Sequence, residues 1–251
     1  MPTYAERGSL AGVVERVRAA VPEAHLLIVD DNSPDGTGEL ADQLAAADSA
    51  VRVLHRAGKL GLGTAYLTGF RTAIDEGYEV VVEMDADGSH LPEQLPALLS
   101  EVAAGADFAL GSRWVSGGSI VNWPWYRQLV SKTGTLVARL SLRSQLHDIT
   151  SGYRAIRTAA LSQLDLDRID AHGYGFQVEL AWALERAGFT IVEVPISFVE
   201  RAEGRSKMTV GIAAEALGIV LRQGFLLRFQ PRRLPGTVRL APGSGDESAA
   251  A

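Results

Sequence analysis

The sequence predicts an α/β protein built around a mostly parallel β-sheet flanked by helices. Short apolar runs rich in β-branched residues alternate along the chain with longer segments that have helical apolar spacing. This alternation is typical of βαβ units with right-handed crossovers. Several of the apolar runs end directly in aspartates, and ligands of open α/β sheets bind at these carboxyl ends of strands.

The first half of the chain contains the most regular elements. Val13, Val14, Val17 and Val21 recur at helical spacing, so a helix is expected from about Ser9. Turns that contain glycine or proline separate the elements that follow. These are expected to be strands at 26–29, 51–54, 80–82 and 108–110, and helices at 37–47, from 63 to about 76, and after 92.

The regular alternation ends after Arg113. The expected elements are then a Gly/Trp/Pro loop at 116–125, a helix at 126–142, an irregular polar segment at 147–154, a helix at 174–187, a strand at 191–194 and a basic loop at 198–207. We expect one domain over 1–229 and a disordered Pro/Gly/Arg-rich tail over 230–251. Within the domain, the apolar segment 208–229 is predicted to be either a membrane-docking helix or a helix packed on the core.

Composition narrows the class of protein. The 251 residues are 47% hydrophobic and 22% charged, with a net charge of −6, which argues against a nucleic-acid binder. The absence of cysteine excludes disulfides, thiol catalysis and zinc–thiolate sites. No signal peptide is visible, and no apolar run approaches the roughly 20 residues that span a bilayer. We expect a cytoplasmic protein that is soluble or rests on a surface.

A pair of aspartates follows the strand expected at 80–82. Asp85 and Asp87 would repel each other unless a cation lay between them, and Mg²⁺ or Mn²⁺ binds one or two carboxylates together with substrate phosphates. We therefore predict a metal–diphosphate site at these residues. Two alternatives stay open. One is a solvated aspartate turn; the other is the Asp-x-Asp-Gly-Thr nucleophile motif of haloacid-dehalogenase-type phosphatases, which segment 85–89 resembles but which in that family follows the first strand.

Two further loops are expected to line the same crevice. Asp30 and Asp31 also end a strand, although the spacing of acidic residues after Asp31 fits an EF-hand calcium loop as an alternative. An EF-hand needs a preceding helix, and here a β-rich run precedes the loop. The segment 58–63 resembles an incomplete phosphate-binding loop, and we predict a helix-entry turn with Lys59 accessible to a ligand.

Cationic side chains concentrate in the irregular segments of this acidic chain. They are Arg113, Arg127, Arg201, Arg205 and Lys207. Guanidinium groups suit phosphates because they contact two oxygens at once and stay charged. As a set beside a metal site, they predict a ligand with more than one phosphate. The two histidines near these segments have no assigned role, and the four tryptophans are predicted to be packing or interface residues.

Six motifs together point to a known family. In order they are Pro2-Thr3-Tyr4-x-Glu6, Val29-Asp30-Asp31-Asn32-Ser33-Pro34-Asp35-Gly36-Thr37, Lys59-Leu60-Gly61-Leu62-Gly63-Thr64-Ala65-Tyr66, Met84-Asp85-Ala86-Asp87-x-Ser89-His90, Gly111-Ser112-Arg113 and Arg201-x-x-Gly204-x-Ser206-Lys207. The chain resembles polyprenyl (dolichyl) phosphate mannosyltransferases, which are GT-A glycosyltransferases of family two. The resemblance runs from Pro2 to about Phe229.

The resemblance implies roles for individual residues. The guanosine part of GDP-mannose would lie against Pro2, Tyr4, Glu6, Val29 and Asp31. The metal and the diphosphate would be held by Asp85, Asp87 and the backbone of Ala86. The donor phosphates and the acceptor side would meet Arg113, Arg201 and Lys207, with Asp87 and these three cations carrying the catalysis. The acceptor phosphate would bind Arg127 and Ser131, and Asp148 would organise the sugar pocket.

The implied reaction is metal-dependent, inverting transfer of mannose to a polyprenyl phosphate. The acceptor is already anionic, so no general base is needed, and catalysis depends on alignment and charge stabilisation. A glucosyltransferase that uses UDP-glucose and an inactive binding or scaffolding relative are the alternatives. A lipid acceptor implies a peripheral protein at the inner face of the membrane, with room for a membrane-embedded partner protein.

The chain departs from the family at its start. Only Met1 precedes Pro2, where relatives have a complete apolar strand, and Ala5 stands where an Asn is usual. We therefore expect a truncated first strand and a reading frame that starts further upstream. A missing strand would leave backbone groups unpaired beside the nucleotide pocket.

Overall fold

The computed structural model describes residues 1–169, 175–200, 218 and 236–241. The strands are β1 (Pro2–Thr3), β2 (Leu26–Asp30), β3 (Val51–His55), β4 (Val80–Glu83), β5 (Phe108–Ser112), β6 (Ser119–Val121), β7 (Arg154–Arg157), β8 (Ile191–Pro195), β9 (Ser197–Val199) and β10 (Val238–Leu240). The helices are α1 (Arg7–Ala20), α2 (Thr37–Ala47), α3 (Leu62–Asp75), α4 (Leu95–Ala103), α5 (Trp125–Leu142), α6 (Thr158–Leu161) and α7 (Gly175–Ala187), with short 3₁₀ turns at Pro92–Gln94 and Leu166–Arg168.

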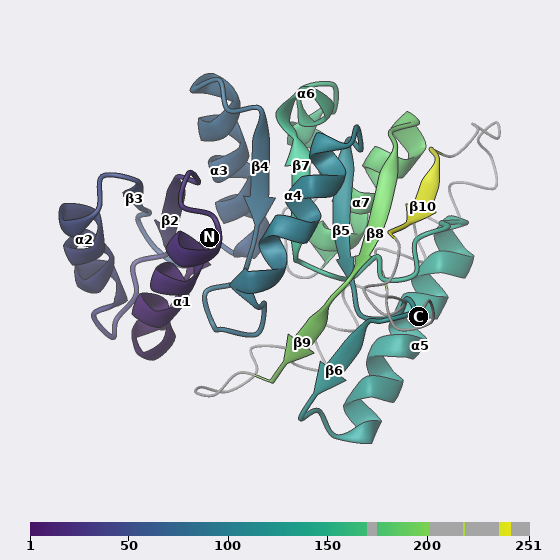
Figure 1. The fold of residues 1–251 in the computed structure, drawn as a ribbon, viewed down its shortest axis with the longest axis horizontal. Coiled ribbons are helices and arrows are strands. Elements are labelled where there is room, and N and C mark those ends of the chain that lie inside the picture. The colour runs from purple at the N-terminus through teal and green to yellow at the C-terminus, as the bar shows by residue number, and fades with distance from the viewer. Residues whose placement is uncertain (170–174, 201–217, 219–235, 242–251) are drawn as a thin grey trace, which may run out of the picture.

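The strands form two main sheets and a small ribbon (Figure 1). One sheet has the order β1-β2-β3 and is parallel throughout. The other has the order β10-β8-β5-β7-β4, in which β7 runs antiparallel to both of its neighbours. The ribbon pairs β6 with β9. The predicted mostly parallel α/β fold is confirmed.

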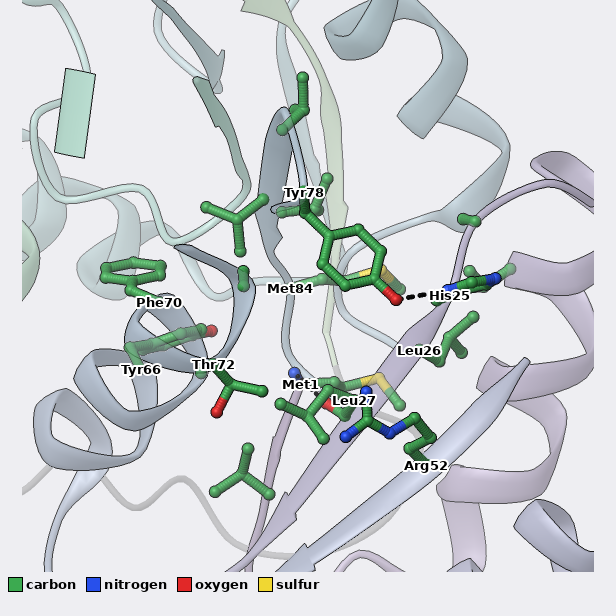
Figure 2. Close-up of a pocket in the computed structure, with 18 of the residues that line it drawn as sticks. Met1, His25, Leu26, Leu27, Arg52, Tyr66, Phe70, Thr72, Tyr78 and Met84 are labelled. Atoms are coloured by element: carbon green, nitrogen blue, oxygen red, sulfur yellow. Dashed lines mark hydrogen bonds between the residues drawn. The ribbon is translucent and has the colours of Figure 1, made fainter. Parts of the chain in front are cut away.

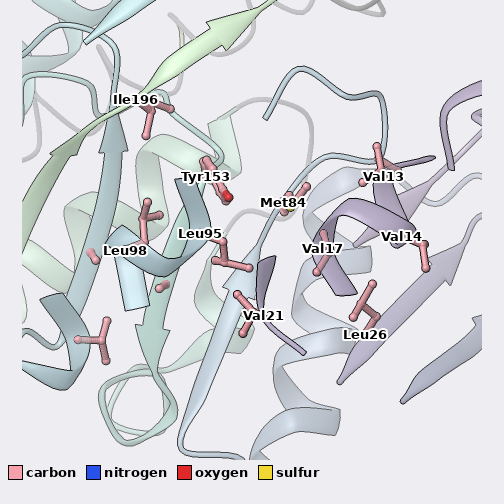
Figure 3. Close-up of a cluster of buried hydrophobic side chains, with 14 of the residues drawn as sticks. Val13, Val14, Val17, Val21, Leu26, Met84, Leu95, Leu98, Tyr153 and Ile196 are labelled. Atoms are coloured by element: carbon pink, nitrogen blue, oxygen red, sulfur yellow. The ribbon is translucent and has the colours of Figure 1, made fainter. Parts of the chain in front are cut away.

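Helices cover both faces of the five-stranded sheet. The inward-facing residues of β5 alternate, so that Ala109 faces α4 while Phe108 and Leu110 face α7. The cluster on the α4 side also includes the valines of α1 that predicted the first helix (Figure 3). Burial of these apolar side chains is the main stabilising contribution to the fold. The valines whose helical spacing predicted α1 are thus the residues that the helix buries in the core.

Strand β7 was not predicted. Arg154, the last residue of the segment expected to be irregular, begins β7 and pairs in register with Glu83 of β4. Both side chains are fully buried, and Arg154 Nε lies 3.5 Å from a Glu83 carboxylate oxygen. A buried charge needs a partner of this kind. Arg154, which belonged to the expected irregular polar segment, is therefore one member of a buried cross-strand ion pair.

Part of the expected disordered tail is a strand. Val238–Leu240 form β10, which pairs with β8 in parallel. The rest of 230–251, apart from residues 236–241, lies outside the described residues, as does the proposed docking segment 208–229 except for residue 218. Among the helices of the described segments, none combines the length and the apolar character needed to cross a bilayer.

The first strand is short, as predicted. β1 contains two residues, with Pro2 opposite Val29 and Thr3 opposite Asp30. Met1 extends the pairing, because its nitrogen donates to the Leu27 carbonyl at 2.9 Å.

A cavity of about 310 Å³ lies beside this strand (Figure 2). Its walls come from β2 on one side, from β4 on the other, and from helices α1, α3 and α4. β1 and β4 are the end strands of their sheets. The two sheets therefore end on either side of a mostly apolar cavity, and no ladder between described strands joins them.

Ala5 adopts an unusual backbone conformation between β1 and α1. Its φ is +55°, in the left-handed region that Asn tolerates better than Ala. We expect Ala5→Asn to raise the free energy of unfolding by about 0.5–1 kcal/mol, measured by urea denaturation. The control is Ala104→Asn, at an exposed position with a φ of −72°, which should give no gain. Equal effects at both positions would contradict this explanation.

Candidate active site

The loop after β4 presents the two predicted metal ligands. Asp87 is 8% exposed, and its Oδ1 accepts hydrogen bonds from the Ser89 backbone N–H at 3.0 Å and the Ser89 hydroxyl at 2.6 Å. Gly88 between them has a φ of +78°, which only glycine adopts without strain. The side chain of Asp85 is 37% exposed. The turn thus fixes one carboxylate and leaves the other accessible to a ligand.

His90 fixes the backbone of this loop. Its Nδ1 accepts the Asp85 N–H at 3.1 Å, so Nε2 carries the proton of the neutral ring. The ring is buried, stacks on Tyr153 and meets Phe198 edge-on. Burial lowers the pKa of His90 and so favours the neutral form. His90 is therefore a positioning residue for Asp85.

The donor set at this loop fits a hard divalent cation. Asp85 and Asp87 supply carboxylate oxygens, and Mg²⁺ or Mn²⁺ completes its shell with water and substrate phosphates when only one or two carboxylates are present. Among the described residues, no group of three or more His, Cys, Asp or Glu side chains could hold a metal without such help. The loop is thus suited to a cation that arrives with a diphosphate.

The Glu83–Arg154 pair lies directly behind this loop. Burial raises the pKa of Glu83 to about 7, although Arg154 opposes the shift. The folded protein therefore binds the Glu83 proton more tightly than the unfolded chain does. The resulting contribution to the free energy of unfolding is lost as the pH rises from about 4.5 through 7. We expect wild type to lose about 1 kcal/mol or more of stability relative to Glu83→Gln between pH 5 and pH 8, measured by urea unfolding. A pH-independent difference between the two proteins would contradict this.

Arg113 and Asp148 form one buried ion pair. Arg113 Nε and Nη2 donate to the two Asp148 carboxylate oxygens at 2.7 Å each, and the Arg113 backbone N–H adds a bond of 2.9 Å. The side chains are 8% and 0% exposed. The resemblance implied a donor-phosphate role for Arg113 and a sugar-pocket role for Asp148. In the structure, the carboxylate of Asp148 holds the Arg113 guanidinium in place.

Glu193 of β8 supports this pair from behind. One of its carboxylate oxygens accepts the Asp148 N–H at 2.9 Å, and the other accepts the His147 N–H at 2.9 Å. Glu193 is fully buried. Sequence reasoning missed it because it lies 45 residues from Asp148 and inside an apolar strand.

The residues expected to bind guanosine gather at the end of β2. Asp31 forms a buried ion pair with Arg56 at 2.7 Å and also accepts the Leu60 N–H at 3.2 Å. Burial raises the pKa of Asp31, and Arg56 opposes this. Lys59 lies over the ring of Tyr4, with Nζ 4.2 Å from the ring centre.

The remaining predicted nucleotide contacts lie in the same region. The β1–β2 register brings Pro2 opposite Val29, and the backbone N–H of Glu6 donates to Thr37 Oγ1 at the start of α2. A strand precedes the Asp31 loop, which excludes the EF-hand alternative. Arg56 had no predicted role. The sequence feature that could have identified it is its position two residues before the glycine-rich turn.

Tyr66 links the glycine-rich turn to the aspartate pair. This residue belongs to α3, which begins after the turn, and its hydroxyl donates to Asp85 Oδ1 at 3.4 Å. Its ring is buried and stacks on the ring of Phe176. The helix that follows Lys59 therefore also contacts the predicted metal ligand Asp85.

An aromatic cluster connects Arg113 to the predicted acceptor residues. The Arg127 guanidinium lies 4.4 Å from the centre of the Trp123 ring, and that of Arg113 lies 6.0 Å from it. Arg127 also pairs with Glu200 at 2.6 Å. Ser131 is one turn further along α5. Trp123 thus packs on Phe198 and also lies beside the two arginines. The other predicted cations, Arg201, Arg205 and Lys207, lie outside the described residues.

Comparison with known sequences identifies the family. The sequence model described as Glycosyl transferase family 2 matches residues 1–165. The chain belongs to glycosyl transferase family 2. Asp85, Asp87 and Arg113 all lie within the matched part, and the aspartate pair follows the fourth strand, unlike the dehalogenase-type motif.

Two curated proteins are similar to this chain over nearly its whole length. The polyprenol monophosphomannose synthase of Mycolicibacterium smegmatis is 51% identical over 95% of this chain and 90% of its own length. The undecaprenyl-phosphate mannosyltransferase of Micrococcus luteus is 53% identical over 93% of this chain and 96% of its own length.

Solved structures share the fold. A mannosyltransferase from Pyrobaculum calidifontis in complex with GDP-Man and Mn²⁺ matches with a TM-score of 0.60 and 16% identity, over 93% of this chain and 64% of that one. Glucosyl-3-phosphoglycerate synthase from Mycobacterium tuberculosis, in complex with Mn²⁺, UDP-glucose and phosphoglyceric acid, matches with a TM-score of 0.61 and 20% identity, over 89% of this chain and 78% of that one. These likenesses support the predicted GT-A fold.

Proposed function

We propose that this family 2 glycosyltransferase moves mannose from GDP-mannose to a polyprenyl phosphate, giving polyprenyl phosphate β-mannose and GDP. The observation that carries the proposal is the identity of 51% and 53% to proteins named for polyprenyl-phosphate mannosylation, each over more than nine-tenths of this chain. The buried ion pair at Arg113 and the aspartate pair at Asp85 and Asp87 provide matching chemistry.

The reaction is a single displacement at the anomeric carbon. An oxygen of the acceptor phosphate forms the new bond to C1 of mannose, the bond from C1 to the donor phosphate breaks, and its electron pair leaves with GDP. Attack from the opposite face converts the α-linkage to a β-linkage. The acceptor is already anionic at neutral pH, so no residue has to remove a proton.

The residues near the aspartate loop stabilise and align charge. Asp85 and Asp87 would hold Mg²⁺ or Mn²⁺, which would neutralise charge on the departing diphosphate. Arg113, locked by Asp148, adds a fixed cation beside Trp123. Alignment of two bound anions by rigid cations is a large part of the available rate enhancement.

The wider set of site residues completes the proposal. Guanosine would bind at Pro2, Tyr4, Glu6, Val29 and Asp31, with Lys59 nearby, and the diphosphate would also contact the backbone of Ala86. Arg127 and Ser131 would bind the acceptor phosphate. Arg201 and Lys207 would contact donor and acceptor phosphates. The protein would work peripherally at the inner face of the membrane, beside a membrane-embedded partner protein.

A transfer assay tests the proposal. Radiolabelled GDP-mannose, Mg²⁺ or Mn²⁺, and a polyprenyl phosphate in detergent are incubated with the protein and extracted into organic solvent. We expect metal-dependent label in the organic phase. No label with GDP-mannose but label with UDP-glucose would establish the glucosyltransferase instead. Donor binding without turnover with either sugar would indicate an inactive binding relative.

A further inference from the structure

Helix α5 carries an unusual concentration of exposed apolar side chains. In the part of the chain that the structure describes, nine large apolar side chains are exposed, and six of them belong to this one helix. They are Trp125, Tyr126, Leu129, Val130, Leu136 and Leu140, with exposed fractions from 52% to 76%. Soluble proteins rarely expose so contiguous an apolar face without a binding partner.

The spacing places four of these side chains in one continuous stripe. Trp125, Leu129, Leu136 and Leu140 follow one another at intervals of four, seven and four residues. At 100° per residue, they fall within an arc of about 60° along a helix about 27 Å long. A different face of the helix, with Thr135, Ala138 and Leu142, packs on the protein. The stripe is therefore additional to the face that folding buries.

The charges on α5 indicate what covers the stripe. The helix contains Arg127, Lys132 and Arg139 and no acidic residue, although the whole chain has a net charge of −6. Lys132 is exposed and lies about 20° from Trp125 around the helix, at the edge of the stripe, whereas Arg127 pairs with Glu200. An apolar face with an exposed basic residue at its edge and no acidic residue suits an anionic lipid surface. A two-fold dimer that paired this stripe with the same stripe of a second copy would instead bring the basic residues of the two helices together.

The position of the helix adds a functional reason. Arg127, the predicted acceptor-phosphate residue, lies in the first turn of α5 and contacts Trp123, which also neighbours Arg113. A lipid phosphate at this site would have its hydrocarbon chain in a bilayer. The exposed stripe begins at the same end of the helix, so it starts within one helical turn of the predicted acceptor residue.

We propose that the exposed face of α5 is the surface through which the protein rests on an anionic lipid bilayer. This rests on the proposed function only for the identity of the acceptor. The segment 208–229, for which the sequence left membrane docking and packing on the core as alternatives, is a different segment. In this arrangement, α5 lies in the interface plane, with its apolar stripe toward the acyl chains and Lys132 among the headgroups.

Vesicle co-sedimentation tests the surface without using the transfer reaction. Vesicles of phosphatidylcholine with phosphatidylglycerol contain no polyprenyl phosphate, so the result is separate from the outcome of the transfer assay. We expect Leu136→Ser combined with Leu140→Ser to lower the partition coefficient about tenfold or more. The matched control, Leu240→Ser on β10, removes an equally exposed leucine and should leave vesicle binding unchanged.

A charge variant and two further measurements complete the test. Lys132→Glu should weaken binding to anionic vesicles and leave binding to pure phosphatidylcholine vesicles unchanged. Unchanged vesicle binding by the folded double leucine variant would overturn the proposal. So would a shift from dimer to monomer in light scattering without a change in vesicle binding, since a second copy would then cover the stripe. If the double leucine variant lost much of its unfolding free energy but bound vesicles unchanged, Leu136 and Leu140 would pack inside the protein instead.

Discussion

Replacing Asp87 with alanine is expected to lower metal-dependent mannosyl transfer about a thousandfold. Asp87 is fixed by two hydrogen bonds from Ser89, and it would supply one of the two carboxylates that hold the cation. Loss of several kcal/mol of charge stabilisation on the departing diphosphate corresponds to a factor of ten in rate for each roughly 1.4 kcal/mol. The measurement is the initial rate of label transfer at saturating metal.

Two comparisons separate a site effect from a folding effect. Asp87→Asn keeps an oxygen acceptor for Ser89, so it should fold like wild type and still lose most of the activity. Asp107→Asn, directly before β5, also removes a carboxylate that accepts a backbone N–H, in this case from Thr190, and should retain activity. Near-normal transfer by folded Asp87→Asn would rule out a metal-ligand role for this residue.

Breaking the Arg113–Asp148 pair should affect stability as well as transfer. Asp148→Asn leaves a buried guanidinium without its carboxylate, and removal of one partner of such a pair costs about 3–5 kcal/mol. We expect a loss of that size in urea unfolding, together with a fall in transfer rate of about a hundredfold or more because Arg113 is no longer fixed.

A double substitution distinguishes the two consequences. Arg113→Met combined with Asp148→Leu removes both charges and fills similar space, so stability should return close to the wild-type value. Transfer should stay low, because the fixed cation is gone. If the double variant regained transfer along with stability, Arg113 would have only a structural role.

Sequence reasoning predicted the elements whose residues follow a simple period. The strands and helices expected up to residue 112 are confirmed to within about two residues, because β-branched runs and helical valine spacing directly reflect burial. Asp85 and Asp87 could be identified because their position at a strand end is a local feature. Family membership followed from motifs of the same local kind.

The supporting residues could not be predicted because they depend on register between distant segments. Arg56 reaches Asp31 across 25 residues, and Glu193 reaches Asp148 across 45. Strand β7 was missed because Arg154 looks like a surface residue until Glu83 is known to lie opposite it. In the sequence, each of these charged residues resembles a solvent-exposed one, whereas in the structure each is buried against a partner that is distant along the chain.

The cavity between the two sheets has a consequence for cooperativity. No ladder between described strands crosses it, so β1–β3 are held to the five-stranded sheet through helix packing and connecting loops. Backbone amides of β2 should therefore exchange with deuterium through a lower-energy local opening than those of β5. A donor nucleotide that contacted Asp31 and Asp85 together would link the two sheets. It should therefore slow deuterium exchange in β2 far more than in β5.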